Sequence, residues 1–597
     1  MSISANYPTV ATSLNLDFAN SQQLDPRISF SRPTTAAYYD ANTTALAEQN
    51  LLLQSQNFPM NWSNSFVTTN ATATTAPDGT TTGNSLTSTS SSSTFTGVYQ
   101  TCTNVPQTYS VYAKAGTSNF VSLINTNFGN SWATFNLSTG LVSSSALCTP
   151  SMVSVGNGWY RCIMANATGT NINFIIAGKD ADPGATPWNN GTMASGNYIY
   201  IWGAQLEQRS AVTAYTPTTT TAITNYIPVL LTAPTNQARF DHDPVARTSL
   251  GLLIEQQSTN LVTYSSDYTN GIWTKSNATI TANADIAPDG TQTAQLFASD
   301  TTYTQHFVRQ VISSLTGTYT FTVYAKAAGI NYLILRENAS IGYRVSFNLS
   351  NGTVGQTSTG LATPTITSVG NGWYRCSITE AVSSQSFGCA LYLSQTDNFD
   401  SPAYTGNGYS GVYLWGAQLE ALAFPTSYIP TTVSQVTRSA DSASMTGTNF
   451  SSWYNISQGT IYVSGRINYL APTNVPVLQV GQSTSNLTLY INAGQVLEWG
   501  QLNTYDITST VNIGTSTFKA LVTGVVNSNV VSGNLKIGVN GSTATSGTGG
   551  YSWPPLAQRI ALGFTDYNSN GLNGWISKLA YYPVALSATN LQSLTGS

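Results

Sequence analysis

Ser154-Val-Gly-Asn-Gly-Trp-Tyr-Arg-Cys162 recurs letter for letter as Ser368-Val-Gly-Asn-Gly-Trp-Tyr-Arg-Cys376. Other matched stretches surround this pair in the same order: Ala76-Pro-Asp-Gly79 with Ala287-Pro-Asp-Gly290, Val111-Tyr-Ala-Lys114 with Val323-Tyr-Ala-Lys326, and Trp202-Gly-Ala-Gln-Leu-Glu207 with Trp415-Gly-Ala-Gln-Leu-Glu420. The offset between partners runs only from 211 (287 − 76) to 214 (368 − 154). A period of this length is far longer than a solenoid unit, so each copy is a whole domain. The chain therefore contains a duplicated domain.

Both copies consist of short segments in which apolar and polar residues alternate, separated by Gly, Asn and Asp. Thr108-Tyr-Ser-Val-Tyr-Ala-Lys114 and Asn331-Tyr-Leu-Ile-Leu-Arg336 are examples. Short strands at regular spacing with turn signals between them are typical of antiparallel sandwiches. We predict an all-β protein with three tandem antiparallel β-sandwich (jelly-roll) domains and a short split N-terminal β module. The expected boundaries are 1–47 (continued at 226–254) for this module, 48–225 and 255–438 for the two copies, and 439–597 for the third sandwich.

The composition limits the classes of function. Only 7% of the 597 residues are Asp, Glu, Lys or Arg, against ~25% in an ordinary soluble protein, and the net charge is −4. Nucleic-acid binding needs a basic surface, and no basic run is present. No stretch approaches the ~18 apolar residues of a membrane span, and no signal peptide is visible at the N-terminus. We therefore expect neither a nucleic-acid nor a membrane partner.

The five cysteines do not predict a disulfide framework. Cys162 and Cys376 are repeat equivalents, whereas Cys102 and Cys148 have no cysteine counterpart in the second copy and Cys389 none in the first. A framework shared by the two copies would place cysteines at matching positions in both. We expect mostly buried free thiols, as in a protein made in a reducing cytoplasm.

Three stretches outside the repeat carry a resemblance to a known class of proteins: Leu24-Asp-Pro-Arg-Ile-Ser-Phe-Ser-Arg-Pro33, Arg239-Phe-Asp-His-Asp-Pro244, and Gly251-Leu-Leu-Ile-Glu255 with Thr259-Asn-Leu261. They resemble phage and prophage structural proteins, in which a carbohydrate-binding-module-like jelly roll carrying Gly-Trp-Tyr-Arg and Trp-Gly-Ala-Gln-Leu-Glu follows directly. The resemblance extends over residues 14–440 and implies that an extra jelly roll is inserted within the N-terminal module. The ending, Leu572 to Tyr582 and Leu586 to Leu594, resembles concanavalin A-like (laminin-G-like) jelly rolls.

The resemblance implies a non-enzymatic virion fibre or adhesin. Such a protein is assembled in the host cytoplasm, is exposed on the particle surface, and has a host surface glycan and other virion proteins as partners. A homo-oligomer is expected, with a trimer favoured, and the N-terminal module is the expected attachment end. One alternative is a head or tail decoration protein that stabilises the particle. The other is a polysaccharide depolymerase.

The sequence offers few candidates for catalysis. A glycosidase needs two carboxylates at a set separation, and Glu207 and Glu420 occupy the same position in both copies. This equivalence favours a structural role, either capping a strand end or pairing with Arg161 and Arg375. The only histidines, His242 and His306, lie in no recognisable catalytic or zinc motif. We expect no catalytic residue and no enzyme activity.

Aromatic residues in loops are the candidates for glycan stacking. The tryptophans that match in both copies, Trp62/Trp273, Trp159/Trp373 and Trp202/Trp415, are expected in cores. Trp188 and Tyr404 lie in Gly-, Pro- and Asn-rich segments, and the third unit offers Tyr551, Trp553 and Tyr567. A loop aromatic beside amide groups suits sugar recognition, although loop anchoring and intersubunit contacts use the same residues.

The matched Pro-Asp-Gly turns contain the candidates for a metal. Asp78 and Asp289 occupy equivalent positions in them. A β-turn that favours Pro, Asp and Gly explains the pattern, and a structural calcium ion held by these carboxylates is the alternative. No other cofactor is expected.

Overall fold

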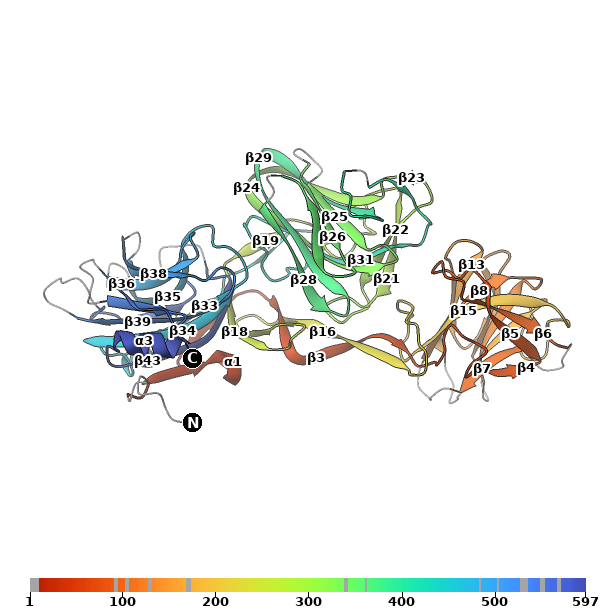
Figure 1. The fold of residues 1–597 in the computed structure, drawn as a ribbon, viewed down its shortest axis with the longest axis horizontal. Coiled ribbons are helices and arrows are strands. Elements are labelled where there is room, and N and C mark those ends of the chain that lie inside the picture. Colours follow the sequence, from red (N-terminus) through yellow and green to blue (C-terminus); the bar gives the residue numbers. More distant parts are fainter. Residues whose placement is uncertain are drawn as a thin grey trace.

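The computed structural model describes residues 10–90, 95–101, 107–126, 131–167, 173–337, 342–359, 362–400, 402–482, 485–501, 504–526, 535–547, 553–565 and 571–596. In this part of the chain the named strands pair antiparallel and form β-sandwiches, which confirms the predicted all-β class. The molecule is elongated, and its three sandwiches do not follow one another in chain order (Figure 1). The C-terminal sandwich lies at one end, the second repeat copy in the middle, and the first copy at the other end.

The first repeat copy is a sandwich of two six-stranded sheets, with strand orders β11-β10-β9-β14-β7-β4 and β12-β13-β8-β15-β6-β5. Its strands are β4 (Ser63–Ser65), β5 (Val67–Thr74), β6 (Gly83–Ser88), β7 (Gly97–Thr101), β8 (Gln107–Ala115), β9 (Phe120–Thr126), β10 (Trp132–Asn136), β11 (Leu141–Ala146), β12 (Thr149–Ser154), β13 (Trp159–Ala167), β14 (Asn173–Lys179) and β15 (Tyr198–Glu207). Alternate residues of these strands point inward and form one apolar core, which contains Val111, Leu123 and Phe174.

The second copy repeats this plan with two much longer strands, β24 and β29, which pair along their whole length. Each contains 22 residues and runs through both layers, so that the two layers form one continuous sheet. The register of the pair shifts between Ile312 and Gly317, where Ser314 adopts a positive φ. Such a bulge bends a strand pair.

The elements of the second copy and its borders are β19 (Ser258–Asn260), β20 (Thr274–Ser276), β21 (Ala278–Asp285), β22 (Ala294–Ser299), β23 (Tyr303–Thr304), β24 (Phe307–Ala328), β25 (Tyr332–Glu337), β26 (Arg344–Asn348), β27 (Thr353–Thr357), β28 (Ala362–Gly370), β29 (Trp373–Ser394), β30 (Tyr404–Thr405), β31 (Gly411–Glu420) and β32 (Val436–Arg438).

The matched tryptophans play the same part in both copies. The indole of Trp159 donates to the carbonyl of Thr75, and that of Trp373 donates to the carbonyl of Ile286 one repeat later. Trp159 and Trp373 are both buried. The prediction that the matched tryptophans belong to cores is confirmed.

The third sandwich is built from both ends of the chain. Strand β1 pairs with β43, β18 pairs with both β17 and β43, and β2 pairs with β33. The elements from the N-terminal half are β1 (Leu14–Asp17), α1 (Phe18–Ser21), β2 (Ser29–Ser31), β17 (Arg239–His242) and β18 (Ser249–Ile254). Leu14, Leu16, Leu252 and Ile254 lie in the same apolar core as the C-terminal strands. Four strands within the predicted split N-terminal module, β1, β2, β17 and β18, thus lie in the sheets of the C-terminal sandwich.

The remaining elements of this sandwich are β33 (Ser442–Thr446), α2 (Thr448–Ser451), β34 (Gln458–Ile467), β35 (Val475–Gln482), β36 (Ser485–Ile491), β37 (Val496–Gln501), β38 (Thr504–Asn512), β39 (Thr517–Val525), β40 (Leu535–Val539), β41 (Thr545–Ser546), β42 (Arg559–Leu562), β43 (Gly574–Tyr582) and α3 (Ala588–Gly596).

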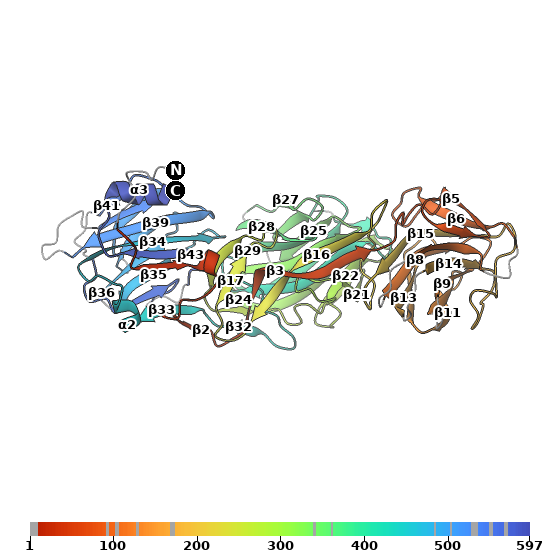
Figure 2. The same ribbon diagram turned by 90° about the horizontal axis from the view of Figure 1, so that it is seen from below.

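A two-stranded ribbon connects the units. It consists of β3 (Ala36–Asn50) and β16 (Ile223–Ala233) and carries the first copy at its far end. Figure 2 shows the ribbon running along the second copy toward the first. Ala37, Ala47, Ile227 and Leu230 of the ribbon pack with Trp373 of the second copy in one apolar cluster.

Five buried charged side chains hold the junction of the ribbon, the second copy and the C-terminal sandwich. Asp441 lies 3.0 Å from Arg32 and 2.5 Å from Arg239, and Glu255 lies 2.7 Å from Arg239 and 3.5 Å from Arg438. Burial raises the pKa of Glu255, but Arg438 and Arg239 outweigh it and lower that pKa to about 2. Removal of one partner would leave a buried charge uncompensated.

Two other predictions concern single features of the chain. The described cysteines Cys148, Cys162, Cys376 and Cys389 are free thiols, and all but the half-buried Cys148 are buried, as expected. Cys102 lies outside the described residues. Among the described helices, none has the length and apolarity needed to cross a bilayer.

Candidate carbohydrate-binding pocket

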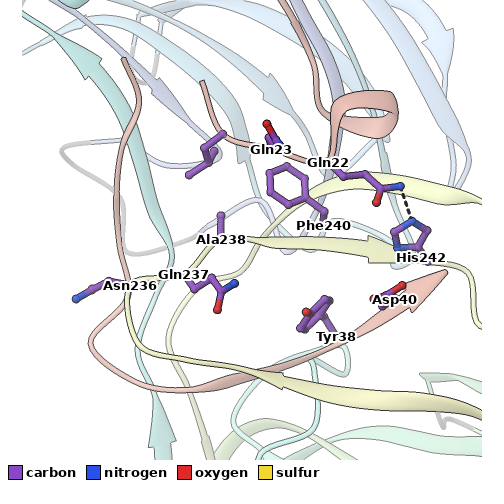
Figure 3. Close-up of a pocket in the computed structure, with 10 residues that line it drawn as sticks. Gln22, Gln23, Tyr38, Asp40, Asn236, Gln237, Ala238, Phe240 and His242 are labelled. Carbon is purple, nitrogen blue, oxygen red and sulfur yellow. Dashed lines mark hydrogen bonds between the residues drawn. The ribbon is translucent and has the colours of Figure 1, made fainter. Parts of the chain in front are cut away.

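A pocket of about 560 Å³ opens beside the junction, between the segment after α1 and the strands β3 and β17. Figure 3 shows its lining as sticks: Gln22, Gln23, Leu24, Tyr38, Asp40, Asn236, Gln237, Ala238, Phe240 and His242. The volume lies in the range of about 300–1,000 Å³ that is common for small-molecule sites. Amide groups predominate in the lining, together with two aromatic rings, one carboxylate and one imidazole.

The alternation of side chains along β3 and β17 brings lining residues of both strands to the pocket. On β3, Ala37 and Tyr39 point into the apolar cluster beneath the ribbon, so Tyr38 and Asp40 point the other way, into the pocket. On β17, Phe240 and the buried His242 line the pocket, and the buried Arg239 and Asp241 alternate with them along the strand.

Asp241 fixes the two strands against each other. Its carboxylate accepts hydrogen bonds from the backbone N–H of Tyr39 (2.7 Å) and from the indole of Trp575 (2.8 Å). Burial raises the pKa of Asp241 to about 6, against these hydrogen bonds, which lower it. The pocket wall is thus attached to both the ribbon and the C-terminal sandwich.

His242 orients a glutamine at the rim. Nδ1 of His242 lies 3.2 Å from the carbonyl oxygen of Tyr39, and Nε2 lies 3.0 Å from the amide nitrogen of Gln22. A carbonyl oxygen can only accept, so Nδ1 carries the proton and Nε2 accepts from Gln22 in the neutral imidazole. Gln22 itself adopts a left-handed conformation at the end of α1, with φ of 50°. This contact holds the Gln22 amide at the pocket edge.

Asp40 is the carboxylate of the pocket. Its Oδ1 accepts from the backbone N–H of Asn42 at 2.7 Å, and its Oδ2 accepts from the hydroxyl of Thr43 at 3.2 Å. A carboxylate offers about four acceptor positions, so these two contacts position Asp40 and leave it able to accept further hydrogen bonds. On the opposite side, Phe240 packs against Phe18 with ring centroids 6.5 Å apart.

The loop aromatics predicted from the sequence do not form a common site. Trp553 is completely buried and stacks against Tyr454, and Tyr404 is 8% exposed and packs against His306. The prediction that Trp553 and Tyr404 stack on a glycan is wrong, because neither ring presents a face to solvent. Trp188 is half-buried beside the small apolar cluster that contains Trp132 and stays a prediction. Tyr551 and Tyr567 lie outside the described residues.

The two aspartates of the Pro-Asp-Gly turns act within their own turns. Oδ1 of Asp78 accepts from the backbone N–H and the hydroxyl of Thr80, and Asp289 binds Thr291 in the same way. This geometry agrees with the turn interpretation. Among the described residues, no group of three or more His, Cys, Asp or Glu side chains is placed to hold a metal ion. The structural calcium ion at Asp78 or Asp289 stays a prediction.

Glu207 and Glu420 are structural, as their equivalence predicts. Both are fully buried, and each accepts hydrogen bonds from the backbone N–H and hydroxyl of a threonine six residues later, Thr213 or Thr426. Arg161 and Arg375 bind the carbonyl oxygens of these same threonines and not the carboxylates. The glutamates therefore cap the ends of β15 and β31.

The sequence contained a signal for the pocket that the motif search missed. Tyr38 with Asp40, and Phe240 with His242, are polar or aromatic pairs spaced two residues apart within strand-like stretches. Period-two spacing predicts that each pair shares a face. It does not predict that the two faces meet, because β3 and β17 lie about 200 residues apart in the chain (239 − 36 = 203).

Comparison with known proteins adds distant likenesses. No protein-family model matches the chain, and no curated protein matches it. The CBM40 of Ruminococcus gnavus IT-sialidase bound to alpha2,3 sialyllactose is 18% identical, with a TM-score of 0.21 over 25% of this chain and 88% of its own. Trypanosoma rangeli sialidase in complex with the inhibitor DANA is 9% identical, with a TM-score of 0.21 over 94% and 98%. The LG1-3 region of the laminin alpha2 chain is 10% identical, with a TM-score of 0.19 over 83% and 97%.

These neighbours are a carbohydrate-binding module, a sialidase and laminin-G-like domains. With identities and TM-scores this low, they carry no argument about the ligand or activity of this chain. None of the three is described as a phage protein.

Proposed function

We propose that the protein is a non-enzymatic saccharide-binding protein, a fibre or adhesin of a phage particle that attaches to host surface glycan. The observation that supports saccharide binding is the pocket between β3, β17 and the segment after α1. It combines the rings of Tyr38 and Phe240 with amide and carboxylate groups of Gln22, Gln237 and Asp40. Aromatic rings cover the C–H faces of a sugar, and amides and carboxylates pair with its hydroxyl groups.

The lining also supports the non-enzymatic part of the proposal. Glycosidases act with two carboxyl groups on either side of the scissile bond. Asp40 is the one carboxylate among the described residues that line the pocket, and both of its oxygens accept hydrogen bonds from the ribbon. The imidazole of His242 is occupied on both nitrogens.

The virion location rests on the resemblance of residues 14–440 to phage and prophage structural proteins. Other virion proteins and further copies of this chain, most simply in a trimer, are the proposed partners. The elongated arrangement, with one repeat copy at the end of the ribbon, suits a protein that extends away from a surface (Figure 1).

The test is binding of labelled full-length protein to bacterial cells and to their purified surface polysaccharide, with reducing ends assayed in the same tubes. We expect saturable binding without new reducing ends, and weaker binding by Tyr38→Ala. Tyr226→Ala, at an exposed tyrosine of β16 outside the pocket lining, is the matched control.

New reducing ends would replace the proposal with a depolymerase. Absence of binding by the assembled oligomer would favour the particle-stabilising role.

A further inference from the structure

The described lining of the pocket contains a carboxylate but no lysine or arginine. Among the described residues that line the pocket, the ionisable groups besides the tyrosine are Asp40 and His242, and none is a lysine or an arginine. Both ring nitrogens of His242 lie within hydrogen-bond distance of protein groups, Nδ1 of the carbonyl oxygen of Tyr39 and Nε2 of the amide of Gln22. The pocket therefore presents the carboxylate of Asp40 to a ligand, and no lysine or arginine among these described lining residues offsets its charge.

Three arginines that lie close to the lining residues along the chain, Arg27, Arg32 and Arg239, are paired with carboxylates, and the exposed Arg247 is not among the residues that line the pocket. Arg27 binds Asp25 through two parallel contacts of 2.9 and 2.8 Å. Arg32 and Arg239 are fully buried and bind Asp441. Arginines committed to carboxylates in this way do not offer the bidentate contact that recognition of a ligand carboxylate uses.

A carboxylated sugar would bring its charge toward Asp40. Like charges brought together in a partly buried site repel each other more strongly than in water. An uncharged sugar meets no such cost, because its hydroxyls can donate to Asp40 and exchange hydrogen bonds with the amides of Gln22, Gln23 and Gln237. Tyr38 and Phe240 supply apolar area for its ring.

We propose that the pocket selects uncharged saccharide units and rejects uronic and sialic acids. This inference rests on the proposed function of the same pocket and names its ligand class. Selection then comes from two features: the ring of Tyr38 retains the sugar, and the carboxylate of Asp40 discriminates against acidic sugars.

The experiment uses pairs of saccharides with and without a carboxylate: two pairs in which a carboxylate replaces a CH₂OH group, and one pair in which a sialic acid residue is added. Methyl glucoside with methyl glucuronide, methyl galactoside with methyl galacturonide, and lactose with 3′-sialyllactose are titrated against the full-length chain by saturation-transfer NMR. We expect an uncharged member to bind about tenfold or more tightly than its acidic partner. Tyr38→Ala should weaken that binding by about tenfold, whereas Tyr226→Ala leaves it unchanged.

Asp40→Asn tests the source of the discrimination. The asparagine oxygen still accepts from Asn42, so the turn is kept while the charge is removed. We expect the preference for the uncharged partner to shrink in this variant.

Equal or tighter binding of the acidic partner that is lost in Tyr38→Ala would overturn the ligand class and leave saccharide binding intact. Binding of no pair, or binding that survives both Tyr38→Ala and Phe240→Ala, would overturn the pocket itself.

Discussion

Glu380 lies on β29 in the second repeat copy and is 3% exposed. Burial, with a smaller effect from the neighbouring carboxylate of Glu337, raises the pKa of Glu380 to about 8. In the unfolded chain the same group releases its proton near its usual value of 4.5. Between these pH values the folded state holds a proton that the unfolded state has lost, so its stability falls as pH rises from about 4.5 to 8.

The variant Glu380→Gln tests whether ionisation of the buried Glu380 carboxyl destabilises the folded protein. An amide has no charge to bury, and the first copy has an amide, Asn166, at the equivalent position (380 − 214 = 166). We expect the variant to melt at a higher temperature than the wild type at pH 8, with a smaller difference at pH 5. Thermal melts of both proteins, followed by circular dichroism between pH 5 and pH 8, measure this difference in melting temperature. An equal difference at both pH values would show that Glu380 does not titrate in the folded protein.

The single residues that the sequence predicted well are those that the duplication constrains. Trp159 and Trp373, and Glu207 and Glu420, occupy matching positions, and matching positions have matching environments. Trp553 has no counterpart, and its Gly- and Pro-rich surroundings resembled a loop at a ligand site. Its burial against Tyr454 depends on contacts with a residue about 100 positions away (553 − 454 = 99), which no local pattern contains.

At the scale of elements, β1 belongs to a core that is built mainly by the other end of the chain. Leu16 is 5% exposed and packs in the cluster that contains Leu579 and Ile461, and its Cα faces that of Leu579 across the β1–β43 pair. Replacement of a buried leucine by alanine costs about 2–5 kcal/mol. We expect Leu16→Ala to lower the melting temperature of the C-terminal sandwich, more than 400 residues away in the sequence.

Leu470→Ala is the control for this prediction, because Leu470 lies in the same sandwich and is 57% exposed. Differential scanning calorimetry separates the transitions of the units. A C-terminal transition unchanged by Leu16→Ala would show that β1 is not part of that core.

The sequence predicted the strands better than their partners. The alternation of apolar and polar residues predicts strands, and the duplication predicts two equivalent sandwiches. The pairing of Leu16 with Leu579 is a contact between the two ends of the chain. Because each strand can pair with many others on pattern alone, the sequence predicts a split N-terminal module but not its pairing with the C-terminal strands.

At the scale of the whole molecule, the pocket lies beside the junction of the ribbon, the second repeat copy and the C-terminal sandwich. Its strands are attached to the ribbon through Tyr39, to the C-terminal sandwich through Trp575, and to the buried charge cluster through Arg239. A site assembled from segments that are distant in sequence has no compact motif. The hydrogen bonds of Asp241 and His242 connect the pocket wall to these neighbouring parts, and a binding site needs such support.

A structure of the full-length chain with a bound saccharide tests the central claim most directly. Crystals are soaked with the uncharged sugar that binds most tightly in solution, and difference density is examined over the whole surface. We predict density between Tyr38 and Phe240, with sugar hydroxyls in hydrogen-bond contact with Asp40 and Gln22. Density at another aromatic residue, such as Trp188 or the highly exposed Tyr303, with an empty pocket would contradict the claim.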